Sequence, residues 1–270
     1  MEIVVRLAKK YKNKFFFTRQ IKWNSVILPF ALLVIWQVII FLGLVKPILL
    51  PSPQQVMKVA MEMIVSGELI RHLSVSLIRV LEGFSLAAIL AVSLGVVLGM
   101  SAVVFQLANG TIQLLRPIPP IAWLPLAILW FGIEEGSKVF IIIVGAFFPI
   151  FTNVLDGIRQ TESKYVELVK VLEISRWRII TKVVIPGALP FIFAGLRTGL
   201  GYAWMCVVAA ELSAGMTGIG YMLTDARAMI QTDRVLVGML AIGAIGKLMD
   251  MMLQLIEKKV IKGKEFYTGK

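Results

Sequence analysis

Two long stretches without a single charged residue limit what this chain can fold into. Residues 26–45 and 84–105 contain no Asp, Glu, Lys or Arg. About 20 apolar residues are enough to cross the hydrocarbon core of a bilayer, and because lipid offers no hydrogen-bond partners, such a segment must be a helix. The composition agrees, since 58% of the residues are hydrophobic, 16% are charged and the mean hydropathy is +0.85. The chain is therefore predicted to be an integral membrane protein.

Six segments are apolar enough to be transmembrane helices, which predicts an all-α membrane protein. Arg116 stands near the start of the third segment, and Arg197 interrupts the fifth. The sixth contains Lys247 and Asp250, which are three residues apart and can pair on one helix face; we interpret this pair as structural. The expected spans are residues 26–45, 84–105, 112–133, 139–155, 183–210 and 235–256.

Lysine and arginine residues outside these segments gather in three regions, which predicts the orientation of the chain. Seven stand before residue 25, six between 159 and 182, and five after 256. Because positive residues resist translocation, these regions and both termini are expected in the cytosol. The formal net charge of +12 is then explained by topology and by contact with anionic lipid of the bilayer, so binding to nucleic acid is not expected.

Residue types that catalysis or metal binding requires are not clustered in the sequence. The single histidine, His72, has no second His or Cys at ligand spacing, and the single cysteine, Cys206, lies in a predicted span. The spans contain no paired carboxylates and no Ser/His/Asp set, and no glycine-rich phosphate loop is followed by Lys and Ser or Thr. We therefore expect no catalytic centre, metal or cofactor in this chain.

Four prolines crowd the third segment, in the run RPIPPIAWLPLAILWFG. Each proline removes a backbone donor, so closely spaced prolines prevent a regular helix. Two interpretations are open at this point. A helix broken at membrane depth needs protein or a water-filled cavity around it, which would place the break beside a translocation path. Alternatively, the prolines form a non-helical start at the cytosolic interface, and the helix begins near Ile121.

The remaining connections also carry patterns. Residues 46–83 contain a Pro-Ser-Pro stop and two amphipathic helical patterns that break near Ser66 and Gly67, so two helices are expected along the outer surface. The glycine-rich loop after the fifth segment is expected to be flexible at its start, and to be either a gate or a plain connector. GxxxG-type spacings predict close helix contacts, with another span or with another subunit. The glycines with these spacings are Gly95, Gly99, Gly195, Gly199 and Gly201.

The connection between the fourth and fifth segments is basic and amphipathic. In residues 164–173, apolar residues recur at helical spacing among charged ones, and Ser175 is placed to be the N-cap of a second short helix that Pro186 would end. Two such helices would present Arg176, Trp177 and Arg178 to their surroundings. On physical grounds the element is either a membrane-surface helix or a docking site for a protein.

Several motifs together resemble one family of membrane transport proteins. The stretch from Glu167 through SRW to VVIPGALPFIFAGLR resembles the cytosolic signature loop of permeases in binding-protein-dependent ATP-binding-cassette importers. The runs LLPSPQQV, RPIPPIAWLPLAILWFGI, GAFFPIFTN and QTDRVLVGML are similar to the branch for nitrate, sulfonates, taurine and bicarbonate, which also includes permeases for pyrimidine precursors. The likeness covers residues 49–256.

This resemblance implies a permease of the type I importer fold with six transmembrane helices, working as a homodimer or occasionally a heterodimer. Two cytosolic ATPase subunits would dock on the loop 159–182 and supply the ATPase activity, and an extracytoplasmic solute-binding protein would deliver the cargo. The localisation implied is the inner membrane of a prokaryote. The chain would divide into a basic cytosolic segment (1–25), a first transmembrane helix (26–45), an extracytoplasmic connection (46–83), a permease core (84–256) and a cytosolic tail (257–270).

The signature loop matches the family pattern at some positions and departs from it at others. Glu167 and Pro186 match, whereas Leu168 and Val169 replace small residues and Glu173 replaces a glycine. A glycine at such a turn adopts positive φ without strain, whereas Glu there costs roughly 1 kcal/mol or more, so the turn is expected to be more helical in this chain. The ATPase-coupling residues implied by the resemblance are Glu167, Leu168, Val169, Glu173, Ser175, Arg176, Trp177 and Pro186.

Residues that could meet the cargo are predicted from the cost of burying charge. Arg116 and Arg197 are candidate counter-charges for an anionic cargo, because an ionised group in a span is costly unless it faces a polar interior. The alternative for both is that the long side chain reaches lipid headgroups at the cytosolic end. Packing or interface roles are open for Trp204 and Glu211. The full set of pathway candidates is Arg116, Pro119, Pro120, Arg197, Trp204 and Glu211.

These features lead to one principal hypothesis, an importer permease for a small anion such as a sulfonate, taurine or nitrate. A permease for a neutral heterocycle is the alternative within the family. A secondary transporter would need more acidic residues in the membrane, and a membrane enzyme would need the polar constellation that the spans lack.

Overall fold

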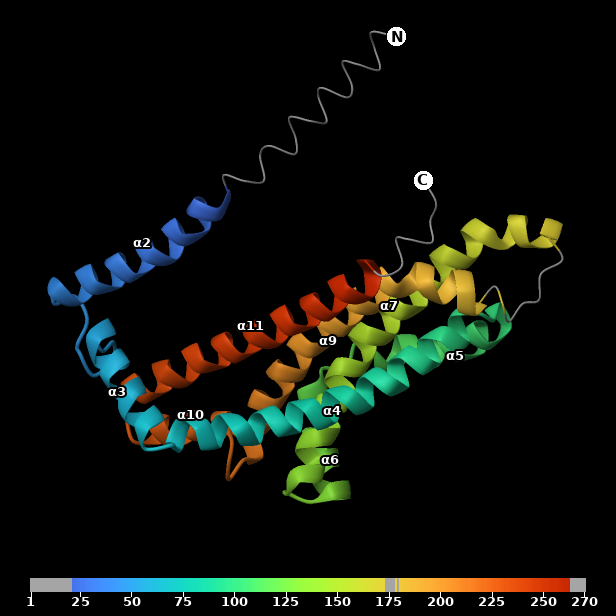
Figure 1. The fold of residues 1–270 in the computed structure, drawn as a ribbon. Coiled ribbons are helices and arrows are strands. Elements are labelled where there is room, and N and C mark those ends of the chain that lie inside the picture. Colours follow the sequence, from blue (N-terminus) through green and yellow to red (C-terminus); the bar gives the residue numbers. More distant parts are fainter. Residues whose placement is uncertain (1–20, 173–177, 179, 263–270) are drawn as a thin grey trace, which may run out of the picture.

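The computed structural model describes residues 21–172, 178 and 180–262, and each regular element in these residues is a helix. Three long helices form the core: α4 (Glu68–Gly99), α7 (Glu135–Leu172) and α9 (Ile185–Ala214). Helix α7 packs against both α4 and α9, and α11 (Thr232–Lys262) runs along α9 (Figure 1). The all-α fold predicted from the sequence is confirmed.

Glycines allow α7 to approach its two neighbours closely. A Cβ added to Gly95 of α4 would lie 2.8 Å from Val154, and one added to Gly199 of α9 would lie 2.4 Å from Ile150. Both Val154 and Ile150 belong to α7. The predicted glycine faces therefore meet another helix of the same chain. Gly201 differs, because nothing lies within 4 Å of its Cβ position.

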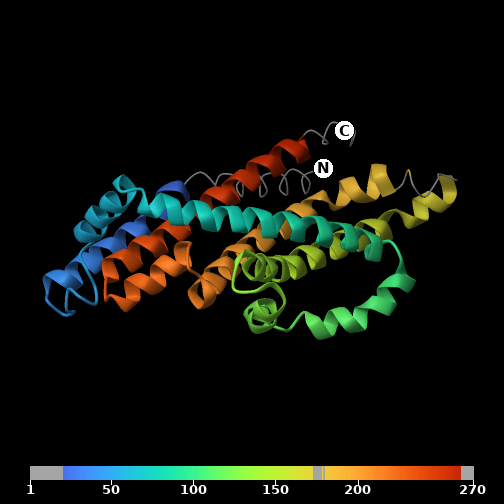
Figure 2. The same ribbon diagram turned by 90° about the horizontal axis from the view of Figure 1, so that it is seen from below.

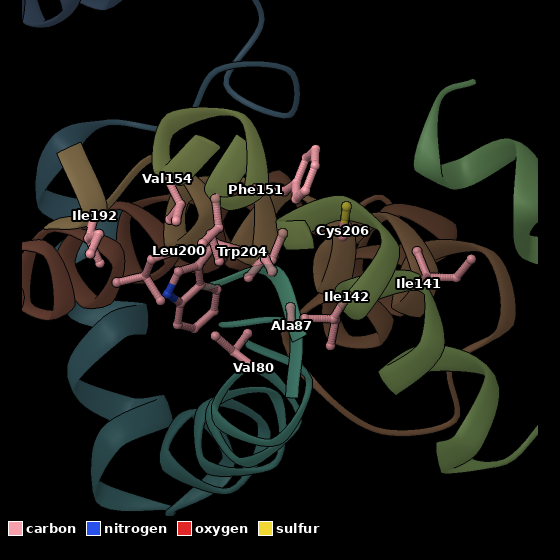
Figure 3. Packing of buried hydrophobic residues seen from close by; sticks show 14 of the residues in the cluster. Val80, Ala87, Ile141, Ile142, Phe151, Val154, Ile192, Leu200, Trp204 and Cys206 are labelled. Atoms are coloured by element: carbon pink, nitrogen blue, oxygen red, sulfur yellow. The ribbon is translucent and has the colours of Figure 1, made fainter. Parts of the chain in front are cut away.

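Apolar side chains from the three core helices fill the space between them. Val80 and Ala87 come from α4, Ile142 and Val154 from α7, and Trp204 from α9. Figure 3 shows these side chains close together in the interior. Each of them is no more than 5% exposed, so the core is dry and tightly packed.

Shorter helices surround this core. Helix α2 (Ile21–Phe41) connects through α3 (Pro53–Val65) to the start of α4, and α10 (Ile219–Ala228) lies between α9 and α11 in the chain. Helices α5 (Ala102–Leu115) and α6 (Leu124–Phe131) form an arc that loops away from the core before returning to α7 (Figure 2). None of the residues of α5 is buried.

The number of membrane spans is not reproduced as six unbroken helices. Among the described residues, four segments are long and apolar enough to cross a bilayer: Glu68–Gly99, Glu135–Thr161, Ile180–Ala214 and Thr232–Ile261. A fifth span exists if the bent pair α5 and α6 is counted as one, and the apolar part of α2, Ile27–Phe41, is shorter than an ordinary span. The predicted first helix over 26–45 in fact ends at Phe41.

The predicted second span, 84–105, has different limits in the structure. The chain breaks at Gly67, which has φ +76°, as the sequence predicted, but the amphipathic helix that follows is continuous with the span and forms one 32-residue helix. This helix ends at Gly99, because Ser101 starts a new helix by accepting the backbone N–H of Val104 at 3.4 Å. Residue 84 therefore lies inside α4 and not at its start.

The proline-rich third segment is broken, and the break lies beside the middle of α7. Helix α5 ends at Leu115, a short 3-10 helix covers Pro120–Trp123, and α6 leaves at 86° to α5. Pro120 lies 3.6 Å from the Cβ position of Gly145, which is near the centre of the apolar stretch 139–155. This position fits a break surrounded by protein, and not a non-helical start at the end of a span.

The connection after the fourth span begins as an extension of α7, which continues to Leu172. A π-helix, Ile180–Val184, leads directly into α9. Pro186 was predicted to end a short helix, but it occupies the first turn of α9, where a proline sacrifices no helical hydrogen bond. The predicted N-cap Ser175 lies outside the described residues.

Candidate functional site

A groove of about 300 Å³ opens between the proline-rich bend, the middle of α7 and the middle of α9. Of the pathway candidates, it includes Arg116 and Pro120, whereas Pro119 does not line it. The bend supplies one wall because its prolines keep the chain from continuing as α5. The groove is lined by Arg116, Ile118, Pro120, Val144, Gly145, Phe148, Pro149, Thr152, Asn153, Thr198 and Tyr202.

Arg116 is the only charged residue in this lining. Its side chain is exposed, and it has no hydrogen bond or ion pair to any residue in the described part of the chain. The lining residues beside it, Thr152 and Thr198, lie in the central parts of α7 and α9. A cation at the centre of a membrane helix costs about 2.5–3.5 kcal/mol, so water or an anion is needed beside it.

Arg197 has a different environment, although it is next to a groove residue in the sequence. Its Nε donates to Asp250 Oδ1 at 2.8 Å, and its Nη1 lies 3.8 Å from Glu257 Oε2. Both partners are on α11. Lys247 also approaches Asp250, at 3.8 Å, as the spacing predicted. Arg197 thus joins α9 to α11, and its charge is balanced within the chain.

Trp204 and Glu211 also lie away from the groove. Trp204 is 5% exposed within the core, where its Nε1 donates to Met249 Sδ at 3.0 Å (Figure 3). Glu211 is 1% exposed near the end of α9, and it accepts hydrogen bonds from Arg79 Nη1 at 2.7 Å and from the Gly220 N–H at 2.8 Å. The structure therefore gathers two of the six pathway candidates at one groove and separates the rest.

Arg79, which the sequence analysis did not single out, organises a second polar site around Glu211. It forms two hydrogen bonds with the carboxylate of Glu135 and donates to the carbonyl and hydroxyl oxygens of Thr217, both at 2.8 Å. All five guanidinium N–H groups therefore have an acceptor, which is how a fully buried arginine is tolerated. We call this group, made of His72, Ser76, Arg79, Glu135, Glu211 and Thr217, the Arg79 cluster.

The Arg79 cluster holds the glycine-rich loop after α9. The N–H of Gly218 donates to His72 Nδ1 at 3.3 Å, and that of Ile219 donates to Ser76 Oγ at 2.8 Å. Gly218 has φ +105°, a conformation that L side chains rarely adopt. The loop that the sequence predicted to be flexible at its start is therefore fixed by hydrogen bonds from Gly218 onwards.

Comparison with known proteins decides what these two sites belong to. Residues 83–262 match the family described as "Binding-protein-dependent transport system inner membrane component". This chain belongs to that family. The sequence-based resemblance is confirmed, and the chain is a multi-pass permease component of an inner-membrane import system.

Three relatives illustrate the breadth of this permease's kinship. The putative aliphatic sulfonates permease SsuC of Bacillus subtilis is 41% identical over 246 residues, which cover 91% of this chain and 89% of the relative. The taurine permease TauC of Escherichia coli is 33% identical over 262 residues, or 92% and 95% of the two chains. The bicarbonate permease CmpB of Synechococcus elongatus is 35% identical over 188 residues, or 69% and 68%.

The predicted ATPase-coupling residues of the permease lie at and beyond the end of α7. Glu167, Leu168 and Val169 are in the last turns of this helix, before Leu172. Near the start of this region, the guanidinium of Arg159 lies 3.5 Å from the centre of the Phe105 ring on α5, a cation–π contact. The other predicted coupling residues, Glu173, Ser175, Arg176 and Trp177, lie outside the described residues.

Several residues of the two sites carried no signal in the permease sequence. Tyr202, Thr198 and Asn153 are ordinary polar residues on apolar helices, and only the folded arrangement places them beside Arg116. Arg79 appeared in the sequence only as a charge in a predicted connection. A usable signal was present, because an arginine three residues after Ser76 on a continuous helix must find acceptors when that face is buried.

Proposed function

We propose that this chain forms the translocation pathway for a small anion in an ATP-driven importer. The observation that carries the proposal is Arg116, an exposed cation without a partner among the described residues, placed beside the centres of two membrane helices. The relatives support the cargo class, since their names specify aliphatic sulfonates, taurine and bicarbonate. Aliphatic sulfonates are the preferred class for this chain, because the SsuC of Bacillus subtilis is 41% identical to it.

The same proposal assigns the chemistry of ATP to partner subunits. Two cytosolic ATPases dock on the loop 159–182, an extracytoplasmic solute-binding protein delivers cargo, and a second copy of this chain completes a homodimer. Both termini are then cytosolic. The length of α7 supports coupling, because this single 38-residue helix carries the Arg79 partner Glu135 at one end, lines the groove in its middle and carries Glu167 near its other end.

A neutral heterocycle is the less favoured cargo. A groove for an uncharged ring would gain nothing from an unpaired arginine, and the cost of placing this cation at helix-centre depth would remain uncompensated. An oxyanion removes that cost, because the planar guanidinium binds two oxygens at once.

The test is uptake by the reconstituted complex of permease, ATPases and solute-binding protein in liposomes. The complex should take up ethanesulfonate or taurine only with ATP inside the liposomes' ATPase-facing compartment, and loaded binding protein should raise ATP hydrolysis. Glu167→Ala should weaken this stimulation, whereas Asp156→Ala, an exposed acidic residue earlier on α7, should not. Uptake that needs an ion gradient and no ATP would contradict the proposal.

A further inference from the structure

The groove beside Arg116 has the properties of a ligand site within the membrane part of the permease. Its volume of about 300 Å³ lies at the lower end of the range for small-molecule sites, roughly 300–1,000 Å³. No acidic residue is in its lining. A site of this size and charge fits a small anion and excludes cations.

Hydrogen bonds already present show which groups are free to bind a ligand. Thr152 and Thr198 donate their hydroxyl protons to carbonyl oxygens of their own helices, to Phe148 and Ala194 respectively, both at 2.9 Å. Both threonines therefore offer oxygen lone pairs to the groove, which suit water or N–H groups of a ligand. They are not the donors that would hold an oxyanion.

Three other side chains provide donors. Asn153 uses its amide Nδ2 for a bond to the Pro149 carbonyl at 2.8 Å, which leaves its second N–H available. The Tyr202 hydroxyl has no hydrogen bond to any described residue, and this side chain is 44% exposed. Together with Arg116, these side chains give the groove one full positive charge and two neutral donors.

The two glycine contacts beneath the groove fix its floor. A Cβ on Gly145 would lie 2.2 Å from Cys206 Sγ of α9 and 3.6 Å from the Cβ of Pro120. Helices α7 and α9 and the bend therefore meet at this glycine. The groove is built by the same packing that holds the core together, so its donors stay in place without a ligand.

We propose that this groove is a binding site for the oxyanion head of the cargo, held by Arg116, Asn153 and Tyr202, so that the permease itself selects for negative charge. This inference rests on the proposed function and deepens it. A cation in a cleft with low-dielectric walls concentrates anions. Selection would then occur twice, once at the solute-binding protein and once in the membrane.

The experiment measures how fast charged thiol reagents modify a cysteine in the groove, in the assembled complex without ATP or binding protein. The buried Cys206 is first replaced by Ala, which leaves no other cysteine. Thr198→Cys then reports on the groove. Ser213→Cys is the matched control, because Ser213 is also exposed on α9 and donates to the carbonyl four residues earlier, but lies outside the groove.

The reagents are a sulfonatoethyl thiosulfonate and its trimethylammonium analogue. Relative to the control position, the anionic reagent should modify Thr198→Cys roughly tenfold faster than the cationic one. Arg116→Gln should abolish this preference, and Arg116→Lys should keep most of it. Ethanesulfonate should slow the reaction, and the uncharged ethanesulfonamide should not.

Two results would overturn the inference. One is a charge preference at Thr198→Cys equal to that at the control or unaffected by Arg116→Gln, and absence of any reaction counts the same way because the site must be reachable from water. The other is a lack of protection by ethanesulfonate, which would mean attraction without binding. ATP-dependent uptake measured on the same complexes separates this failure from a failure of the proposed function, which would appear as loss of ATP dependence.

Discussion

Arg79 and Glu211 form an ion pair with 2.7 Å between Nη1 and Oε1, and neither side chain is more than 2% exposed. The pair joins α4 to the end of α9, and its remaining donors and acceptors are used by Glu135, Thr217 and the Gly220 N–H. A buried pair of this kind adds little stability over apolar residues, but removing one partner leaves a buried charge without compensation. The pair therefore specifies one arrangement of these helices.

Arg79→Met should lower the free energy of unfolding by about 3–5 kcal/mol, because the Glu211 carboxylate loses its counter-charge. The double variant Arg79→Met with Glu211→Leu should lose less than the single variant, since it removes both charges. Thermal unfolding in detergent measures both effects. Arg71→Met is the control, because Arg71 is exposed on the same helix and should be tolerated. Equal losses in the single and double variants would show that the pair does not act as a unit.

Gly218→Ala should destabilise the loop that the Arg79 cluster holds. The added Cβ would lie 2.2 Å from Glu211 Oε1, and the residue has φ +105°, so steric overlap and backbone strain combine to about 2 kcal/mol or more. Gly67→Ala is the matched control, with φ +76° and nothing within 4 Å of its Cβ, so it should show strain alone. Hydrogen exchange of residues 215–220 measures the opening. Similar protection in the two variants would contradict the role given to Glu211.

Gly199→Ala and Gly201→Ala should have opposite effects, although they are neighbours on α9. A Cβ at Gly199 overlaps Ile150 of α7 at 2.4 Å and should cost about 1–3 kcal/mol. A Cβ at Gly201 meets nothing within 4 Å, so alanine's better helix propensity should make this change neutral or stabilising. Melting temperatures of the two variants in detergent test the difference. Equal destabilisation would mean that α7 and α9 do not pack through Gly199.

Arg197→Gln should leave the charge preference of uptake unchanged. The Arg197 side chain is 37% exposed and already paired with Asp250 and Glu257, so the substitution should cost under about 1 kcal/mol of stability. Uptake of ethanesulfonate against ethanesulfonamide by the reconstituted complex measures the preference. If Arg197→Gln removed it, the cargo would pass along α11 instead of the groove.

The sequence was sufficient to predict helices, glycine contacts and the proline break, because each is a local property. Periodicity located the apolar faces, and the prolines at 117–125 located a bend. Continuity was harder to predict. The amphipathic pattern after Gly67 has the same period as the apolar span that follows, so nothing in the sequence distinguishes one helix from two.

The two polar sites were only partly predictable, since they depend on contacts between distant parts of the chain. Arg116 was identified from its position near an apolar segment, but its neighbours Asn153 and Tyr202 have no sequence pattern in common with it. Arg79 is 56 positions from Glu135 and 132 from Glu211. A buried charge reveals that a partner must exist, but the fold alone identifies the partner.

The most direct test of the account is the initial rate of ATP-dependent anion uptake by complexes that carry Arg116→Gln or Arg116→Lys. The probe is the anion that the unaltered complex takes up, and the ATPase rate is measured in the same vesicles. The account predicts that Arg116→Gln lowers uptake about tenfold or more while Arg116→Lys retains most of it, because the concentration of anions in the groove depends on this charge. Unchanged anion uptake with Arg116→Gln would contradict the account.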